Sequence, residues 1–516
     1  MLTIMLPVRL TMPTDTSSTT QLYPVDIRTS QVLYKAQSIV KAEQQAITEL
    51  GSNGGYVLMQ RAAAALLKLL QQQWPAPCSI LVYAGSGNNG GDGYLLAAMA
   101  RASGYDIRLS QHGDHSALGP AAKQAAAAAA KAGVPLVEEF AEAQLLIDAL
   151  FGTGLNRPLD KPTIALINQI NHSDKPVLAV DIPSGLKANS GVAMPVAVNA
   201  SATLSFIGLK PGLLMQDGLD HCGELWLSPL QLNAVLESIK PVCHSITAKA
   251  LQNLLPGRAA NSHKGHFGRV LVIGGDHGFG GAAIMTAQAA VNCGAGMVSL
   301  YSRSEHVGAM LTRQPEVMVS STDCARLLQG ADVIAIGPGL GRQSWGQALM
   351  AQALATNKPM LLDADALNYI AGLTEKEQAA LKRQNWVLTP HPGEAARLLN
   401  CSSQQIQQDR LAAVSQLQQR FGGVVLLKGA GTLICDQSGE VTLLAAASPA
   451  LASGGMGDVL SGIIAALLAQ GLNGADACQL GAWLHLNAAA SLARQQPRPW
   501  LVATDLIPQL KLQLIN

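Results

Sequence analysis

Two glycine-rich segments contain residues whose types and spacing are suited to binding phosphate groups and to catalysis. The first is GSGNNGGDG (85–93), which follows an apolar run and precedes the helix-forming stretch YLLAAMARASG (94–104). Its G-x-G-x-x-G spacing lets backbone N–H groups at the start of a helix approach a phosphate closely. The same spacing occurs in dinucleotide-binding dehydrogenases, in which case Asp114, beyond the next apolar run, could bind a ribose.

Polar side chains around this segment exceed what a dehydrogenase turn needs. Asn88, Asn89 and Asp92 lie inside it, where glycines alone would suffice. Asp148 in LIDALFGTGL and Asp181 in AVDIPSG each end a later apolar run. The carboxyl ends of strands border the crevice in which open α/β sheets bind ligands. Each aspartate alone could be a helix cap, but their shared position favours a binding or catalytic site.

The second segment is SGGMGD (453–458), which opens the apolar helix candidate VLSGIIAALLAQ (459–470). Its backbone N–H groups can bind a phosphoryl group at a helix N-terminus, while the carboxylate of Asp458 accepts a proton. The alternative is that Asp458 only caps the helix. The motifs around it favour the catalytic interpretation.

Other polar residues end apolar runs in the same half of the chain. Lys428 in LLKGAGT (426–432) precedes two glycines, which favours contact with a phosphate over a solvated side chain. Asp363 and Asp365 in LLDADALN (361–368) are candidate magnesium or substrate ligands. Structural hydrogen bonding explains these two aspartates equally well.

An alternation of apolar runs and alanine-rich stretches must position these residues. The runs are continuous, as expected for parallel strands buried on both faces, and AAKQAAAAAAKAG (121–133) predicts a crossover helix between two of them. The strand candidates are 79–85, 105–110, 143–152, 176–185, 202–208, 269–275, 296–302, 332–339, 359–367, 386–394 and 423–431.

The alternation is lost near residues 230–250, which predicts a connection between two α/β domains. We expect a flexible extension at 1–24, an N-terminal Rossmann-like three-layer α/β sandwich at 25–235, and a second α/β domain at 245–516. A chain of 516 residues exceeds what one ordinary core holds.

The composition excludes several classes of protein. The formal net charge is +1, which offers no basic surface for nucleic acid or for an anionic membrane. No apolar run reaches the length of a membrane span. The eight cysteines are scattered without metal-binding spacing, which predicts buried free thiols in a cytoplasmic protein.

The motifs GSGNNGGDG, DALFGTGL and VDIPSG, in this order, resemble the NAD(P)HX epimerase family (the YjeF N-terminal fold). The resemblance implies that Asp181 performs acid/base work, and that potassium is held by the oxygens of Asn89, Asp148 and Ser184. Gln60 departs from the acidic residue expected in relatives, which puts only a packing contact in doubt. The resemblance places these residues on the hydrated cofactor: Asn88, Asn89, Gly90, Gly91, Asp92, Gly152, Thr153, Gly154, Leu155, Asn156, Arg157, Pro158 and Asp181.

The second half is similar to the ribokinase-like fold, through GPGLG (337–341), TPHPGE (389–394), LLKGAGT and ASGGMGDVLSG (452–462). Kinases of this fold carry Asn-x-x-Glu where this chain has His391-Pro392-Gly393-Glu394, so the resemblance is to the ADP-dependent NAD(P)HX dehydratase branch. It implies that the hydrated cofactor contacts Gly281, Ala282, Gly339, His391 and Asp458. It implies that the adenine nucleotide contacts Lys428, Gly429, Ala430, Gly431, Thr432 and Gly457.

Together the two resemblances imply a bifunctional enzyme that repairs hydrated NADH and NADPH. The first domain would interconvert the R and S forms, and the second would dehydrate the S form while ADP becomes AMP and phosphate. Potassium and magnesium are the expected ions, NADHX, NADPHX and ADP the expected small-molecule partners, and a homo-oligomer the expected assembly. Two alternatives stay open: a hydroxymethylpyrimidine- or sugar-type kinase in the second half, and a non-catalytic binding module in the first.

Overall fold

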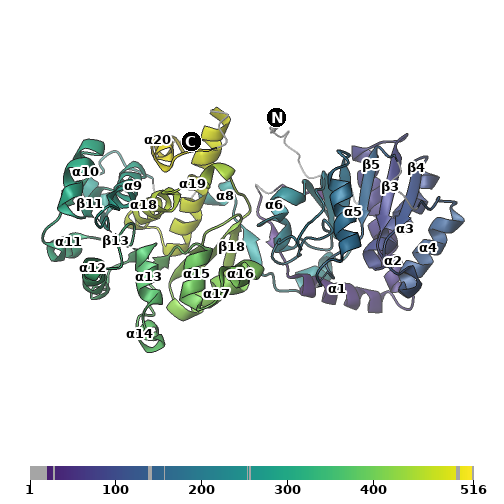
Figure 1. The fold of residues 1–516 in the computed structure, drawn as a ribbon, viewed down its shortest axis with the longest axis horizontal. Helices are drawn as coiled ribbons and strands as arrows, with labels where there is room; N and C mark the ends of the chain where they lie inside the picture. The colour runs from purple at the N-terminus through teal and green to yellow at the C-terminus, as the bar shows by residue number, and fades with distance from the viewer. Residues whose placement is uncertain are drawn as a thin grey trace.

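A computed structural model describes residues 20–26, 29–137, 142–155, 157–252, 254, 257–495 and 500–513. Within these residues the chain forms two α/β units, one coloured purple to teal and the other green to yellow (Figure 1). The predicted α/β class is confirmed. Most of the expected extension, residues 1–19, lies outside the described residues, and the boundaries at 235 and 245 stay predictions.

The first sheet is built from parallel strands, apart from one antiparallel pair at its edge, β1 with β8. Its strand order is β1-β8-β7-β6-β5-β3-β4. The strands are β1 (Tyr23–Pro24), β3 (Ser79–Ala84), β4 (Asp106–Gln111), β5 (Leu145–Ala149), β6 (Val177–Val180), β7 (Ala202–Phe206) and β8 (Glu224–Ser228). The helices of this unit are α1 (Ala36–Glu49), α2 (Gly54–Gln73), α3 (Asn88–Ala102), α4 (Pro120–Lys131), α5 (Lys161–Asn171), α6 (Gly218–His221) and α7 (Asn233–Glu237).

Successive residues of β3 face opposite sides of this sheet, because side chains alternate along a strand. Ile80 and Val82 belong to the core that contains Leu66 of α2 and Leu96 of α3. Leu81 and Tyr83 belong to a separate core that contains Ile167 of α5. Helices therefore cover both faces, which gives the three layers expected from the continuous apolar runs.

The second sheet is parallel from β12 to β16 and antiparallel where β16, β17 and β18 follow one another. Its order is β12-β11-β10-β13-β14-β15-β16-β17-β18-β9-β2. The strands are β2 (Val32–Leu33), β9 (Cys243–Ser245), β10 (Arg269–Ile273), β11 (Met297–Tyr301), β12 (Met318–Ser320), β13 (Val333–Ile336), β14 (Met360–Leu362), β15 (Trp386–Leu388), β16 (Val424–Leu427), β17 (Thr432–Cys435) and β18 (Val441–Leu444).

Two cores also flank the second sheet. Val270 and Val272 of β10 join one core, and Leu271 and Ile273 join the other. The helices around this sheet are α8 (Ala248–Gln252), α9 (Gly280–Asn292), α10 (Val307–Arg313), α11 (Cys324–Gly330), α12 (Ser344–Leu354), α13 (Asp365–Ala371), α14 (Glu375–Ala380), α15 (Pro392–Leu399), α16 (Ser403–Gln408), α17 (Arg410–Phe421), α18 (Met456–Ala469), α19 (Gly474–Gln495) and α20 (Ala503–Gln513).

The edge strand of the second sheet, β2, comes from near the start of the chain, which the sequence does not reveal. β2 follows β1 of the first sheet and precedes the rest of the first unit, yet it pairs antiparallel with β9 at the end of the second sheet. Leu33 of β2 is fully buried and belongs to the same apolar core as Met215 of the first unit and Leu433 of the second. The chain therefore runs from β1 in the first sheet to β2 in the second, builds the rest of the first unit, and returns to the second sheet at β9.

All eleven strand candidates coincide with strands, and 121–133 coincides with α4. The stretch near 230–250, predicted as a plain connection, contains α7 and β9. All eight cysteines are free and seven are buried, as predicted. In the described part of the chain, no helix is both long and apolar enough to cross a bilayer.

Candidate active sites

A cavity of about 620 Å³ opens at the carboxyl ends of the strands in the first unit. Its walls come from α1, α2, the start of α3 and the loops that follow β5, β6 and β7. Predicted substrate-binding residues on these walls are Asn88, Asn89, Asp92, Gly152, Thr153, Gly154, Leu155, Arg157 and Asp181. Gly90, Gly91 and Pro158 are not among the lining residues, and Asn156 lies outside the described residues.

The GSGNNGGDG segment differs from the loop that its glycines suggest. Helix α3 already begins at Asn88, with Gly87 at its N-cap. The glycines of its first turns allow close packing, because a Cβ at Gly90 would lie 1.9 Å from the carbonyl oxygen of Gly85. The helix N-terminus therefore lies at the cavity, where its free N–H groups can face an anion.

Asp181 carries the most specific geometry of this cavity. It follows β6 in a left-handed conformation (φ 66°) and accepts a hydrogen bond from the backbone N–H of Phe206. The ammonium of Lys210 lies 2.5 Å from its carboxylate and also donates to the Ser205 hydroxyl and the Phe206 carbonyl. Lys210 is fully buried. The alternative in which Asp181 only caps a helix is wrong, since its partners are the ammonium of Lys210 and the backbone N–H of Phe206 in β7.

Two residues of this site, Lys210 and Glu43, were not predicted from the sequence. Lys210 lies in SFIGLKPG, shortly after a strand candidate, so the rule that selected the aspartates could have selected it. Glu43 comes from α1 and lines the cavity, and no motif marks it. Burial, followed by the charge of Asp181, raises the pKa of Glu43. Burial, then Glu43 and Asp181, raises the pKa of Asp92 well above its usual range.

Asp148 and Ser184, two of the predicted potassium ligands, are in direct contact. The Ser184 hydroxyl and backbone N–H donate to the two carboxylate oxygens of Asp148, at 2.6 and 2.7 Å. Burial raises the pKa of Asp148 to about 6 despite these hydrogen bonds. Asn89 lies close by against Gly152, and its buried amide nitrogen has no hydrogen-bond partner among the described residues. Asp114, the ribose-binding alternative, instead caps a short turn with Ser116.

In the second unit, Asp458 lies in the first turn of α18. Gly455 (φ 87°) occupies the N-cap position, so the alternative in which Asp458 caps this helix is wrong. The backbone carbonyl of Asp458 accepts a hydrogen bond from Thr286 of α9, which fixes the turn. Burial, and then the negative charge of Asp363, raise the pKa of Asp458 to about 7. A carboxylate with that pKa can accept a proton near neutral pH.

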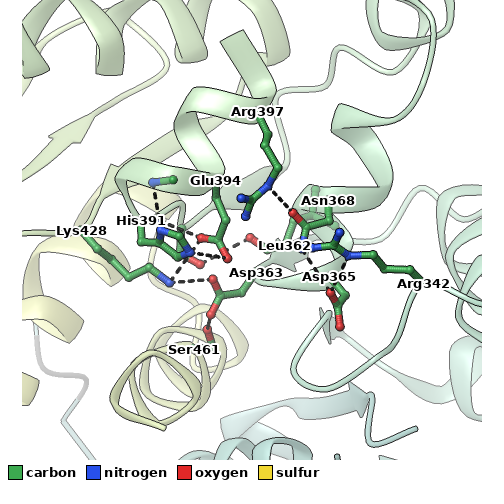
Figure 2. Close-up of polar contacts among 12 residues, drawn as sticks. Arg342, Leu362, Asp363, Asp365, Asn368, His391, Glu394, Arg397, Lys428 and Ser461 are labelled. Carbon is green, nitrogen blue, oxygen red and sulfur yellow. Dashed lines mark hydrogen bonds and ion pairs between the residues drawn. The ribbon is translucent and has the colours of Figure 1, made fainter. Parts of the chain in front are cut away.

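Lys428 points its ammonium toward Asp363, as Figure 2 shows. Its ammonium is 2.8 Å from Asp363 and 3.9 Å from Glu394, and a Cβ on Gly457 would lie 3.2 Å from it. Burial opposes the charge of Lys428, but Asp363 and Glu394 outweigh burial and raise its pKa. Ser461 donates to the second oxygen of Asp363. The solvated alternative for Lys428 is wrong.

His391 and Glu394 bind each other at the start of α15 (Figure 2). The Glu394 carboxylate accepts the backbone N–H of His391, and the His391 ring accepts the N–H of Gly393. Burial and then the charge of Lys428 lower the pKa of His391, which favours a neutral ring. Glu394 is therefore engaged as a helix cap and as a partner of Lys428.

The remaining predicted residues lie at the start of α9, in the loop after β13 and at the start of α13. Gly339 (φ 59°) follows β13 and lies against the backbone of Phe279. Phe279 is the N-cap of α9, whose first turn contains Gly281 and Ala282. Asp365 accepts hydrogen bonds from the Gly341 N–H and the Asn368 amide. Asp363 and Asp365 are thus occupied by hydrogen bonds and ion pairs. Across the described ranges, no cluster of three or more His, Cys, Asp or Glu side chains could hold a metal ion.

Arg410 of α17 is another residue that no motif signals. It is 1% exposed, and its guanidinium donates to the carbonyls of Leu427, Lys428 and Ala430. It fills the space beside Gly429, where a Cβ would lie 2.7 Å from its Nη2. Arg410 therefore fixes the KGAGT loop, residues 428–432, from the inside of the second unit.

Two family models match the chain, one in each unit. The model described as "YjeF-related protein N-terminus" matches residues 55–212, and the model described as "NAD(P)H-hydrate dehydratase" matches residues 270–511. Among solved structures, the chain resembles a ribokinase-like superfamily protein from Enterococcus faecalis (29% identity, 52% of this chain, 95% of that chain, TM-score 0.48). It also resembles an ADP/ATP-dependent NAD(P)H-hydrate dehydratase from Bacillus subtilis (27% identity, 52% of this chain, 97% of that chain, TM-score 0.46).

Curated relatives match both units at once. The bifunctional NAD(P)H-hydrate repair enzyme Nnr of Coxiella burnetii is 41% identical over 94% of this chain and 99% of its own length. The enzyme of the same name from Escherichia coli is 41% identical over 97% of both chains. The order of the two units, their motifs and this coverage agree. The chain belongs to the family of bifunctional NAD(P)H-hydrate repair enzymes.

Proposed function

We propose that this chain restores hydrated NADH and NADPH through two successive reactions. Residues 25–235 interconvert the R and S forms, and residues 245–516 dehydrate the S form at the expense of ADP. The two family models fall inside these ranges, which supports the division. The single observation that carries the proposal is that each unit holds a lysine–carboxylate pair beside a residue that we assign to the chemistry: Lys210 binds Asp181 itself, and Lys428 binds Asp363, whose charge raises the pKa of Asp458.

In the first unit, the cavity residues of the α3 start and of the loop after β5 hold the hydrated cofactor, and Asp181 transfers the proton that accompanies epimerisation. The buried ammonium of Lys210 fixes the carboxylate of Asp181 and stabilises its negative charge. Glu43, whose pKa is raised by burial, faces the same cavity and can supply a proton. The contacts to substrate are an assignment by matched motif.

Asn89, Asp148 and Ser184 are the residues that would hold potassium. They offer carboxylate, hydroxyl and amide oxygens, the donors that a hard cation prefers, and the Asp148 carboxylate is completely buried. A potassium ion would balance that charge and order the loop after β5. The three carboxylates of the second unit that could hold magnesium, those of Asp363, Asp365 and Glu394, already contact Lys428 or N–H donors.

In the second unit, Asp458 removes the proton from the ring hydroxyl of the S form. The hydroxyl oxygen attacks the terminal phosphoryl group of ADP, an O–P bond forms, and AMP leaves. N–H groups of residues 455–457 and the ammonium of Lys428 stabilise the charge on the phosphoryl oxygens. The C–O bond then breaks as phosphate departs and the adjacent ring carbon loses a proton, which restores the dihydronicotinamide. Gly281, Ala282, Gly339 and His391 border the ring, and the KGAGT loop with Gly457 holds the nucleotide.

Incubation of the purified chain with an equal mixture of the two NADHX epimers, with and without ADP, tests this proposal. We expect complete recovery of NADH with ADP and none without it. Recovery of only half would mean that the first unit does not epimerise. Accumulation of a stable phosphorylated alcohol with ATP would favour the kinase alternative.

A further inference from the structure

The loop that we assign to the nucleotide receives a contact from the other unit. After β7, the first unit sends residues 211–217 toward the second, and the backbone N–H of Gln216 donates to the carbonyl of Ala430 (3.1 Å). Met215, which is fully buried, fills the space beside Gly431, where a Cβ would lie 2.4 Å from the Met215 Cβ. The contact therefore falls on the KGAGT loop itself.

Gln216 connects the two units through its side chain as well. Its Nε2 group donates to the carbonyl of Ser190 in the first unit (2.7 Å) and to the carbonyl of Gln407 in the second (2.8 Å). Gln216 adopts a left-handed backbone conformation, φ 53°, that side chains seldom adopt without compensation. The two side-chain hydrogen bonds and the backbone bond to Ala430 provide that compensation.

The Ala430 carbonyl is thus held from two directions. Arg410 donates to it from within the second unit (2.7 Å), and Gln216 donates to it from the first. Gly429 (φ 151°) and Gly431 (φ 71°) on either side permit backbone conformations that other residues resist. A loop with two such glycines needs outside contacts to stay in one conformation, because glycine loses the most conformational freedom when it is ordered.

We propose that Gln216 is a positioning residue for the nucleotide site, through which the epimerase unit preorganises the KGAGT loop of the dehydratase unit for ADP. This inference rests on the proposed function, in which that loop binds the nucleotide. Contacts already made before binding reduce the ordering that binding must supply. The first unit therefore contributes to the affinity of the second for ADP without touching the reacting atoms.

The test uses the full chain with the substitution Gln216→Glu, which keeps the size of the side chain but replaces both N–H donors with an acceptor facing two carbonyls. We expect the KM for ADP to rise about three- to tenfold, as the loss of one or two hydrogen bonds predicts, while kcat and the epimerisation rate stay within about twofold. Hydrogen exchange at residues 428–432 should become faster without ADP. Gln437→Ala, at an exposed glutamine that binds the Gln384 carbonyl, is the matched control and should change none of these.

Hydrogen exchange of the unsubstituted chain distinguishes the nucleotide-binding role of residues 428–432 from the positioning role of Gln216. If ADP does not protect residues 428–432, the nucleotide assignment of the loop is wrong. If ADP protects them but Gln216→Glu leaves the KM for ADP unchanged, only the positioning role is overturned. A fall in kcat and in thermal stability with no change in KM would reduce Gln216 to a structural contact between the units.

Discussion

Each unit of this chain holds one lysine against an aspartate, Lys210 fully buried and Lys428 with a side chain that is 20% exposed, but the two lysines bind different kinds of partner. Lys210 binds Asp181, the residue that we assign to the chemistry of the first unit. Lys428 forms its ion pair with Asp363 and not with Asp458, the assigned base. Burial and the neighbouring Asp363 raise the pKa of Asp458 to about 7, although the charge of Lys428 acts in the opposite direction.

The difference shows that a buried lysine tunes a site through its choice of partner. Bound directly to the reacting carboxylate, it compensates that charge and fixes its position. Bound to a neighbouring carboxylate, it holds that neighbour in place and leaves the reacting carboxylate without a direct ion pair.

The largest effect is expected for Asp458→Asn. This substitution preserves size but removes the base, so dehydration should slow by about 100- to 10,000-fold. ADP binding and thermal stability should change little, because Asp458 does not cap α18, and epimerisation should be unaffected. Dehydration of the S form at the normal rate would remove Asp458 from the mechanism.

Lys210→Met should produce the next largest effect, on both stability and epimerisation. It leaves the largely buried Asp181 carboxylate without its ion pair, a change that typically costs about 3–5 kcal/mol in unfolding free energy. Asp181→Ala alone should abolish R-to-S conversion and leave ADP-dependent removal of the S form intact. The double variant Lys210→Met/Asp181→Asn should recover part of the stability but no epimerisation. A Lys210→Met chain as stable as the unsubstituted one would contradict the proposed role of the pair.

The pH profile of dehydration should show a smaller, graded effect. The pKa of Asp458 is raised to about 7, so Asp458 holds its proton up to that pH and works as a base only above it. The single-turnover rate on the S form should fall about tenfold per unit as pH drops below 7. A rate that stays level down to pH 5 would indicate another base.

The smallest effect is expected for Ser184→Ala in the first unit. Ser184 donates twice to Asp148, once from its hydroxyl, and it is one of three proposed potassium ligands. Thermal stabilisation by potassium chloride, compared with choline chloride, should need about ten times more salt in the variant. The potassium effect should also weaken below about pH 6, where Asp148 takes up a proton. Equal responses to both salts in the unsubstituted chain would exclude the site.

The sequence predicted the parallel strands well because runs such as SILVYAG are buried on both faces and need no partner to be visible. It also predicted that Asp148, Asp181 and Lys428 lie at the carboxyl ends of strands and that Asp458 lies at the start of a helix. It could not reveal Lys210 or Arg410 as buried cations, since their burial depends on chain segments far away in the sequence. Strand β2 has two residues, Val32 and Leu33, and so offers no periodicity at all.

Strand β2 also determines how the two activities can be separated. Because all of the first unit except β1 lies between β2 and β9 in the chain, the second sheet is discontinuous in sequence. A fragment that starts at residue 241 would begin with β9 as an unpaired sheet edge, which is prone to pair with other chains. During synthesis β2 leaves the ribosome long before β9 and must wait for it until the rest of the first unit has emerged. Gene fragments that express the dehydratase alone should therefore carry a substitute for this strand, or a charged residue that protects the exposed edge.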